Sequence, residues 1–176
     1  MAPQSLPPIT LVLGGARSGK SAFAESLLAT CADPVYVATA ELRDDEMAER
    51  VRHHRARRGR HWLTVEEPYD LAAALAAHSR PGRPLLVDCL TLWLSNLLLA
   101  NLPVEAEILR FTESLPGLPG PVVLVANEVG LGIVPDNPLA RAFRDHAGRL
   151  NQAVAACSQH VVFVAAGLPL SLKDIR

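Results

Sequence analysis

A short segment near the start of the chain has the residue types and spacing of a phosphate-binding loop. Residues 14–21 read Gly-Gly-Ala-Arg-Ser-Gly-Lys-Ser and match the pattern G-x-x-x-x-G-K-S. Backbone N–H groups of such a loop point inward around an anion, and the dipole of the helix that follows favours negative charge there. In this interpretation Lys20 contacts the β- and γ-phosphates of a nucleotide, and the Ser21 hydroxyl ligates Mg²⁺. The expected nucleotide contacts in the loop are Gly14, Gly15, Ala16, Arg17, Ser18, Gly19, Lys20 and Ser21.

The alternative is a glycine-rich turn that merely connects two elements, and the flanking residues favour the loop. The apolar, β-prone run 9–13 precedes it, and residues 22–29 after it read as a helix. Strand, loop and helix in this order are the context that the nucleotide-binding pattern requires.

The rest of the chain must supply the sheet and helices that position this loop. Several later apolar runs are continuous rather than alternating, as expected for strands of a parallel sheet covered on both faces. The expected fold is a P-loop NTPase-like (RecA-like) α/β domain of three layers with a largely parallel central sheet, spanning residues 9–176 after a loose, proline-rich tail at 1–8. Further strands are predicted at 35–38, 61–66, 85–88, 121–128 and, as the last strand, 161–165; helices are predicted at 44–58, 70–79, 90–100, 103–115 and 138–158.

The composition excludes several classes of protein. The 176 residues carry a formal net charge of −1 and only 5% aromatic residues, which argues against a nucleic-acid partner. The three cysteines are far apart and lack metal-ligand spacing, so neither a disulfide framework nor a zinc site is expected. The N-terminus lacks a targeting signal, and no run of about 18 apolar residues predicts a membrane span. We therefore expect a cytoplasmic protein, in which the apolar stretch 90–100 forms a buried helix or an oligomer contact.

Candidate functional residues lie at the carboxyl ends of three of the predicted strands. In open α/β folds ligands bind beyond the carboxyl ends of the strands, so Thr39, Ala40 and Glu41 are candidate ligand contacts; an ordinary turn is the alternative. Asp88 ends the strand at 85–88, where a P-loop protein carries the carboxylate that holds Mg²⁺ through water. A helix cap is the simpler interpretation of this aspartate. The glycine-rich loop 129–137 also falls at this edge, where loops often carry function.

The predicted helix 44–58 begins with acidic residues and ends with basic ones, the polarity that a helix dipole prefers. Its apolar stripe is thin. His54 lies on that stripe with Met47 and Val51, whereas His53 falls on the charged side. The simplest interpretation is a structural histidine beside solvated arginines, but several guanidinium groups close to a phosphate loop would also suit a triphosphate.

These segments together resemble one family. The relevant residues are 14–21, 36–40, Asp45-Glu46-Met47 with Arg50, His53-His54-Arg55, Trp62 with Thr64 and Glu66, and Asn127-Glu128-Val129-Gly130-Leu131-Gly132-Ile133-Val134-Pro135-Asp136-Asn137. In order and spacing they are similar to the bifunctional adenosylcobinamide kinase/adenosylcobinamide-phosphate guanylyltransferase family of cobalamin biosynthesis. The match extends over nearly the whole chain after the tail.

The resemblance implies two reactions. A hydroxyl of adenosylcobinamide takes the γ-phosphoryl group of ATP or GTP; GTP then donates GMP to adenosylcobinamide phosphate through a histidine–GMP intermediate, giving adenosylcobinamide-GDP and pyrophosphate. The histidine corresponds to His54, and a homotrimer is implied. Asp88 stands where some members carry Glu. Besides the loop, the implied nucleotide contacts are Thr39, Ala40, Glu41, Arg55, Ala56, Arg57, Arg58, Glu66 and Asp88, with Ser21 and Asp88 at the metal.

Two other functions fit part of the sequence. A monofunctional small-molecule kinase would use the loop and leave His54 structural. A nucleotide-gated binding or switch module would hydrolyse slowly and signal through the loop 129–137. Labelling with α-³²P GTP distinguishes them, because only the bifunctional enzyme retains GMP covalently.

Overall fold

The computed structural model describes residues 6–41 and 61–175. The predicted helix 44–58 lies outside the described residues, and with it His53, His54 and residues 55–58. Most of the predicted N-terminal tail lies outside them as well.

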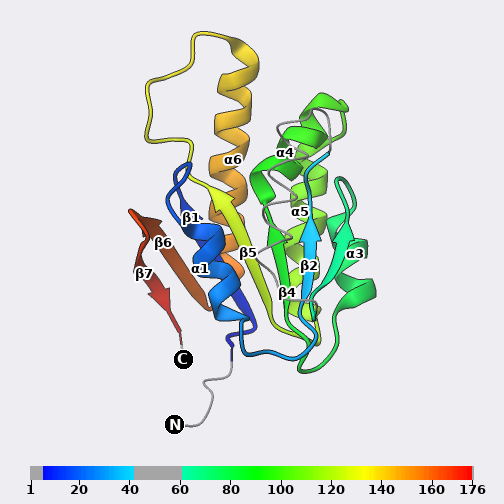
Figure 1. The fold of residues 1–176 in the computed structure, drawn as a ribbon. Helices are drawn as coiled ribbons and strands as arrows, with labels where there is room; N and C mark the ends of the chain where they lie inside the picture. The colour runs from blue at the N-terminus through cyan, green and yellow to red at the C-terminus, as the bar shows by residue number, and fades with distance from the viewer. Residues whose placement is uncertain (1–5, 42–60, 176) are drawn as a thin grey trace.

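The described residues build one seven-stranded sheet in the order β3-β2-β4-β5-β1-β6-β7 (Figure 1). Every neighbouring pair is parallel except β6 and β7, which confirms the predicted, largely parallel sheet. The carboxyl ends of six strands therefore meet at one edge of the sheet. The strands are β1 Ile9–Gly14, β2 Val35–Ala38, β3 Leu63–Glu66, β4 Leu85–Asp88, β5 Val122–Asn127, β6 His160–Ala165 and β7 Leu168–Asp174.

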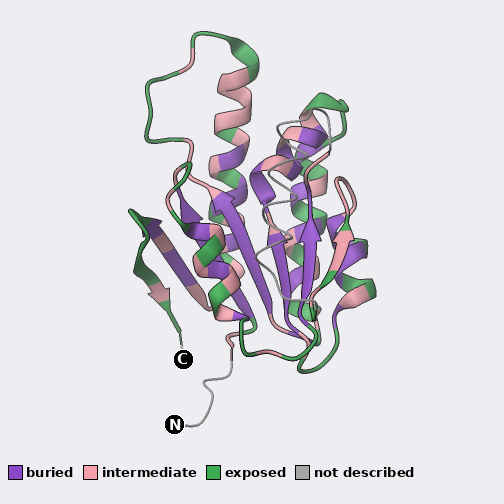
Figure 2. Ribbon diagram, viewed as in Figure 1, coloured by how far each residue is buried: buried purple, intermediate pink, exposed green. Residues whose placement is uncertain are grey.

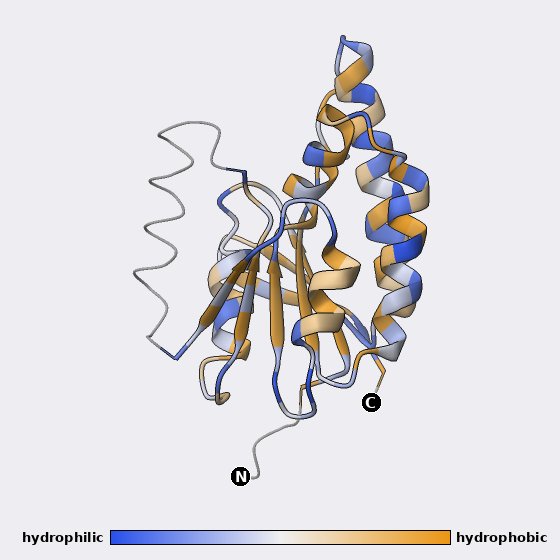
Figure 3. Ribbon diagram, turned by 90° about the vertical axis from the view of Figure 1, so that its right-hand side faces the viewer, coloured by the Kyte–Doolittle hydropathy of each residue, from blue (hydrophilic) through white to orange (hydrophobic). Residues whose placement is uncertain are grey.

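Helices cover both faces of the sheet, as predicted. Leu11 and Leu124 belong to one buried cluster and Val12 and Val125 to the other, because neighbouring strand residues point to opposite faces. Figure 2 shows the central strands buried almost throughout, and Figure 3 shows them as mainly hydrophobic. The second face packs against α1 Lys20–Leu27, and we call it the α1 face. The first face packs against four helices: α3 Leu71–His78, α4 Leu90–Leu99, α5 Val104–Ser114 and α6 Pro138–Cys157. A 3-10 turn, Leu115–Gly117, follows α5.

The prediction that 161–165 is the last strand is wrong. The chain turns at Ala166 and Gly167, with φ of 51° and 79°, and returns as β7 antiparallel to β6. Two residues with positive φ suit a tight hairpin, because their twist matches that of the flanking strands. Strand β7 is an edge strand whose three leucines remain exposed: Leu168 (73%), Leu170 (61%) and Leu172 (58%).

The apolar segment 90–100 forms α4, of which Leu90, Trp93 and Leu94 are buried in the core. The expected buried helix is therefore confirmed. Among the helices of the described ranges, none combines the length and hydropathy needed to cross a bilayer.

Helix α3 begins at a cap made by Asp70, and this cap gives a first testable prediction. The Asp70 carboxylate accepts a hydrogen bond from the Ala73 N–H at 3.0 Å and lies 2.8 Å from an Arg110 guanidinium nitrogen. Half of the Asp70 side chain is exposed, so the ion pair adds little and the cap dominates. Asp70→Ala should lower the free energy of unfolding at pH 7 by about 1 kcal/mol, measured by urea titration.

The same interactions determine how this effect depends on pH. The Ala73 N–H first, and then Arg110, hold the pKa of Asp70 below its usual range. The stabilisation is therefore complete above the ordinary aspartate pKa of about 3.9 and is lost as pH falls through the lower, folded-state pKa. The difference between the wild type and Asp70→Ala should shrink in acid; a difference that grew would contradict the cap. Arg110→Ala should cost less than Asp70→Ala.

Candidate functional site

The loop between β1 and α1 has the backbone of a phosphate-binding loop. Lys20 is the first residue of α1 and is only 9% exposed. Its ammonium group donates to the Gly15 carbonyl at 3.1 Å, so the side chain lies back along the loop. Arg17 and Gly19 adopt positive φ values of 56° and 94°, which turn the chain sharply around Ser18 before the helix begins.

Two glycines of the loop are required by close packing. A Cβ on Gly14 would lie 2.5 Å from both the Ser18 hydroxyl and the Val164 carbonyl oxygen. A Cβ on Gly19 would lie 3.1 Å from the Cα of Gly167. The glycines of the sequence pattern therefore allow the loop to pack against the end of β6 and the turn that follows it.

The β6–β7 turn contacts the phosphate loop and supports it. The sequence did not predict this contact. The Gly167 N–H donates to the Ser18 carbonyl at 2.8 Å. The signal was weak, because the Ala-Gly pair between two apolar runs has the glycine of a two-residue hairpin but not the Asn, Asp or Gly that usually precedes it. Gly167 is thus a structural partner of the phosphate loop although it lies nearly 150 positions along the chain.

Asp88 lies on the same face of the sheet as the loop. It ends β4, where Leu86 belongs to the cluster beneath α1, so the alternation of β4 places Asp88 on the α1 face. The Tyr36 hydroxyl donates to Asp88 Oδ2 at 3.2 Å, and Tyr36 itself is only 5% exposed. A buried hydroxyl therefore holds the carboxylate in one orientation.

The thiol next to Asp88, that of Cys89, is buried. Burial raises the pKa of the Cys89 thiol to about 11, and the charge of Asp88 acts in the same direction. The thiol therefore stays protonated near neutral pH.

Of the three predicted contacts after β2, Thr39 has a structural role. It is fully buried, and its hydroxyl donates to the Cys89 carbonyl at 2.7 Å and accepts from the Cys89 N–H at 2.9 Å. Asn96 donates to the Thr39 carbonyl at 2.8 Å. The Thr39 side chain thereby joins β2 to the start of α4, and it leaves Ala40 and Glu41 as the more exposed residues of the segment.

Two glutamates lie at the outer part of this edge. Glu41 follows β2, where its carboxylate accepts a hydrogen bond from the Tyr69 hydroxyl. Glu66 ends the neighbouring β3, opposite Ala38, and is exposed. The sheet thus gathers carboxylates on one side of the phosphate loop.

Strand β5 ends between the loop and Asp88. Asn127 pairs with Gly14 of β1, and the Glu128 N–H donates to the Gly14 carbonyl at 3.0 Å. The loop that follows carries very exposed apolar side chains: Leu131 (82%), Ile133 (97%) and Val134 (60%).

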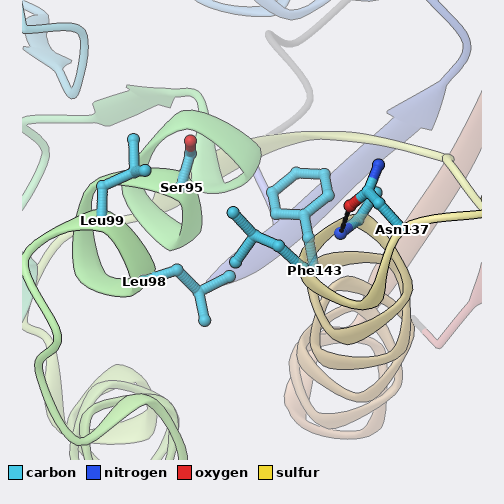
Figure 4. A pocket seen from close by; sticks show the side chains of 7 residues that line it. Ser95, Leu98, Leu99, Asn137 and Phe143 are labelled. Atoms are coloured by element: carbon cyan, nitrogen blue, oxygen red, sulfur yellow. Dashed lines mark hydrogen bonds between the residues drawn. The ribbon is translucent and has the colours of Figure 1, made fainter.

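A separate apolar pocket of about 340 Å³ lies between α4 and the start of α6, and Figure 4 shows Leu98 and Phe143 between the two helices. None of its residues belongs to the phosphate loop. It is lined by Ser95, Leu98, Leu99, Asn137, Leu139, Ala140 and Phe143.

The structure thus brings the predicted site residues 14–21, Thr39, Ala40, Glu41, Glu66 and Asp88 to one edge of the sheet, whereas His54, Arg55, Ala56, Arg57 and Arg58 lie outside the described residues. Within the described part of the chain, no three His, Cys, Asp or Glu side chains cluster as a ready metal site. A tightly turned glycine-containing loop at a helix N-terminus, beside an oriented carboxylate, is suited to binding nucleotide phosphates.

Comparison with known proteins now identifies the family. Residues 10–172 match the model of the family described as cobinamide kinase / cobinamide phosphate guanyltransferase. The chain belongs to this family. The expected resemblance is confirmed over almost the entire sequence.

Relatives that match over nearly their whole length agree. The chain is 52% identical over 166 residues to the bifunctional adenosylcobalamin biosynthesis protein CobP of Pseudomonas aeruginosa, covering 93% of this chain and 96% of the relative. It is 41% identical over 178 residues to the bifunctional adenosylcobalamin biosynthesis protein CobU of Escherichia coli K12, covering 93% and 98%. The CobU protein of Salmonella typhimurium is similar at 42% identity with the same coverage. The protein is therefore a bifunctional enzyme of cobalamin biosynthesis, a cobinamide kinase and cobinamide-phosphate guanylyltransferase.

A solved structure supports the fold alone. An ATPase from the type III secretion system of pathogenic bacteria superposes with a TM-score of 0.50 at 12% sequence identity. The match covers 93% of this chain and 56% of the ATPase chain. The predicted P-loop NTPase-like fold is thereby confirmed.

Proposed function

We propose that both reactions use one nucleotide site at the carboxyl edge of the sheet, built on the loop 14–21. The observation that carries this proposal is the common placement of the loop, Lys20 and Asp88 on the α1 face. Phosphoryl transfer requires mainly positioning and neutralisation of charge, which loop amides and a buried ammonium group provide. Ala40, Glu41 and Glu66 extend the same edge toward the rest of the nucleotide.

We propose Mg²⁺ as the metal of this site, held by Ser21 and Asp88. The fit rests on the chemistry of the donors, since hydroxyl and carboxylate oxygens are ligands that Mg²⁺ prefers, and on the Tyr36 hydroxyl that orients the carboxylate. When bound, Mg²⁺ supplies charge neutralisation at the β- and γ-phosphates. Ser21 directly follows Lys20 at the N-terminus of α1 and Asp88 ends β4, so the two donors come from separate elements of one edge.

The role of Asp88 can be tested through the metal requirement. Asp88→Asn should raise the Mg²⁺ concentration for half-maximal kinase activity at least tenfold, because a charged ligand is lost. Tyr36→Phe should shift it in the same direction by a smaller factor, because only the orientation of the carboxylate is affected. A Mg²⁺ titration of each variant measures this. Titrations that matched the wild type would move the metal role to Glu128.

We propose His54 as the nucleophile of guanylyl transfer. An imidazole nitrogen of His54 bonds to the α-phosphorus of GTP while the bond to the α,β-bridging oxygen breaks, and pyrophosphate leaves. A phosphate oxygen of adenosylcobinamide phosphate then attacks the same phosphorus and regenerates the histidine. A neutral imidazole is available for this near pH 7. Arg55 and Arg58, with Ala56 and Arg57 between them, stand one to four positions further along and are proposed to bind the triphosphate.

Incubation with α-³²P GTP tests the proposed mechanism. We expect a protein-bound label that is stable to base and labile to acid, as a phosphoramidate should be, and that is discharged by adenosylcobinamide phosphate. A protein that phosphorylates adenosylcobinamide without retaining label would be acting as the kinase alone. Label lost in base would indicate a nucleophile other than histidine.

We also propose that the protein is a cytoplasmic homotrimer. The support is the exposed apolar surface of the loop 129–137 and of β7, which exceeds what scattered surface residues explain. Sedimentation equilibrium would measure the assembly directly, with a mass three times that of the chain expected.

A further inference from the structure

Asn127 occupies a central position at the nucleotide edge. It is the last residue of β5, the strand between β1, which leads into the phosphate loop, and β4, which ends in Asp88. Val123 and Val125 belong to the cluster beneath α1, whereas Leu124 and Ala126 belong to the other. Strand alternation therefore places the Asn127 side chain on the α1 face, which also carries the loop and Asp88.

The backbone of Asn127 is held from the opposite layer. Its N–H donates to the Thr91 hydroxyl at 2.7 Å, and its carbonyl accepts from the Asn151 amide at 3.3 Å. Thr91 and Asn151 are each 8% exposed and belong to α4 and α6. The Thr91 side chain thus anchors the end of β5. Helices α4 and α6 thereby fix the position of the Asn127 backbone, from which the side chain extends.

The side-chain oxygen of Asn127 lacks a partner among the described residues. Asn127 Oδ1 is buried and has no hydrogen-bond partner among the residues that the structure describes. An unpaired buried acceptor is unfavourable and requires an explanation. The Ser18 hydroxyl of the phosphate loop is buried and unpaired in the same way. Two such atoms at the nucleotide edge indicate that their partners arrive with the substrates.

The chemistry of an amide oxygen restricts what it can bind. It accepts hydrogen bonds, so it does not pair with the phosphate oxygens of the nucleotide, which are also acceptors. Among the groups that react in the kinase step, the attacking hydroxyl of adenosylcobinamide is the one with a proton to donate. We propose that Asn127 is a catalytic residue of the kinase reaction, whose Oδ1 accepts a hydrogen bond from this hydroxyl and aims its oxygen at the γ-phosphorus.

The amide orients the nucleophile and is unchanged by the reaction. The corrinoid oxygen bonds to the γ-phosphorus while the bond to the β,γ-bridging oxygen breaks, and that electron pair leaves with the nucleoside diphosphate. The hydroxyl proton passes to water. This inference rests on the proposed nucleotide site, but it can fail alone: if Lys20→Ala is inactive and Asn127→Ala is not, the site stands and the role of Asn127 is refuted.

Asn127→Ala tests the proposal. Turnover of adenosylcobinamide should fall about 100-fold, the usual loss when a reacting group is no longer aligned. The dissociation constant for a fluorescent GTP analogue with Mg²⁺ should stay within about twofold of the wild type, since the proposal assigns the amide to the corrinoid hydroxyl and not to the phosphates. The melting temperature should not fall, because the variant removes an unpaired buried atom and keeps both backbone hydrogen bonds. Asn127→Ser, whose side chain is too short to reach, should reproduce these results.

Gln152→Ala is the matched control, because it deletes an exposed amide on α6 rather than the amide at the end of β5, and it should leave every measurement unchanged. Three outcomes would overturn the proposal. Undiminished turnover would remove any catalytic role. Weaker nucleotide binding in parallel with the loss of turnover would assign the amide to a phosphate. A raised Mg²⁺ requirement would assign it to a metal-bound water.

Discussion

Replacing Lys20 with alanine should reduce phosphorylation of adenosylcobinamide by about 1000-fold or more while the protein remains folded. Lys20 lies within the loop, 9% exposed, with its ammonium group 3.1 Å from the Gly15 carbonyl oxygen. A fixed positive charge at the β- and γ-phosphates acts where charge develops during transfer, and single groups of this kind commonly contribute 10²–10³ or more. Steady-state turnover with γ-³²P GTP, together with circular dichroism, measures both parts of the prediction.

Lys173→Ala is the matched control for this variant. The Lys173 ammonium donates to the Ala155 and Ala156 carbonyls at 2.8 and 3.1 Å, so it completes the end of α6 far along the chain from the loop. We expect a slightly lower free energy of unfolding. Turnover should stay within about twofold of the wild type. Normal turnover of Lys20→Ala would refute the assignment of the phosphate loop.

Replacing His54 with asparagine should eliminate the GMP–protein adduct and guanylylation but retain most kinase activity. Transfer of the γ-phosphoryl group does not require a covalent intermediate, whereas guanylyl transfer through histidine does. His53→Asn is the adjacent control and should have a far smaller effect, because the helix that the sequence predicts at 44–58 would place the two histidines on different sides. Mass spectrometry of the labelled protein identifies the modified residue. A GMP group on His53 or on a lysine would contradict the assignment.

Much of the fold was predictable because its signals are local. The continuous apolar runs at 35–38 and 85–88 identified buried parallel strands, and the structure has both with the predicted bounds. The loop 14–21 was recognisable because its glycines, lysine and serine are neighbours in sequence and their spacing alone encodes the anion site. Strand β7 was missed although Leu168, Leu170 and Leu172 alternate with other residues, because Pro169 argues against a strand and the three leucines remain exposed.

The candidate site likewise combines features that local sequence predicts with features that only tertiary contacts determine. By itself the sequence determined the family, the phosphate loop, and the residues at strand ends, since each depends on short spacings. Only the tertiary structure decided the role and orientation of each of those residues, because both depend on hydrogen bonds between strands and helices that are distant in sequence. Thr39 turns its hydroxyl to the backbone of Cys89, Asp88 is oriented by Tyr36, and Gly167 supports Ser18 from the far end of the chain. Asn127 is the clearest case, because an unpaired buried oxygen becomes visible only when every neighbouring donor has been placed.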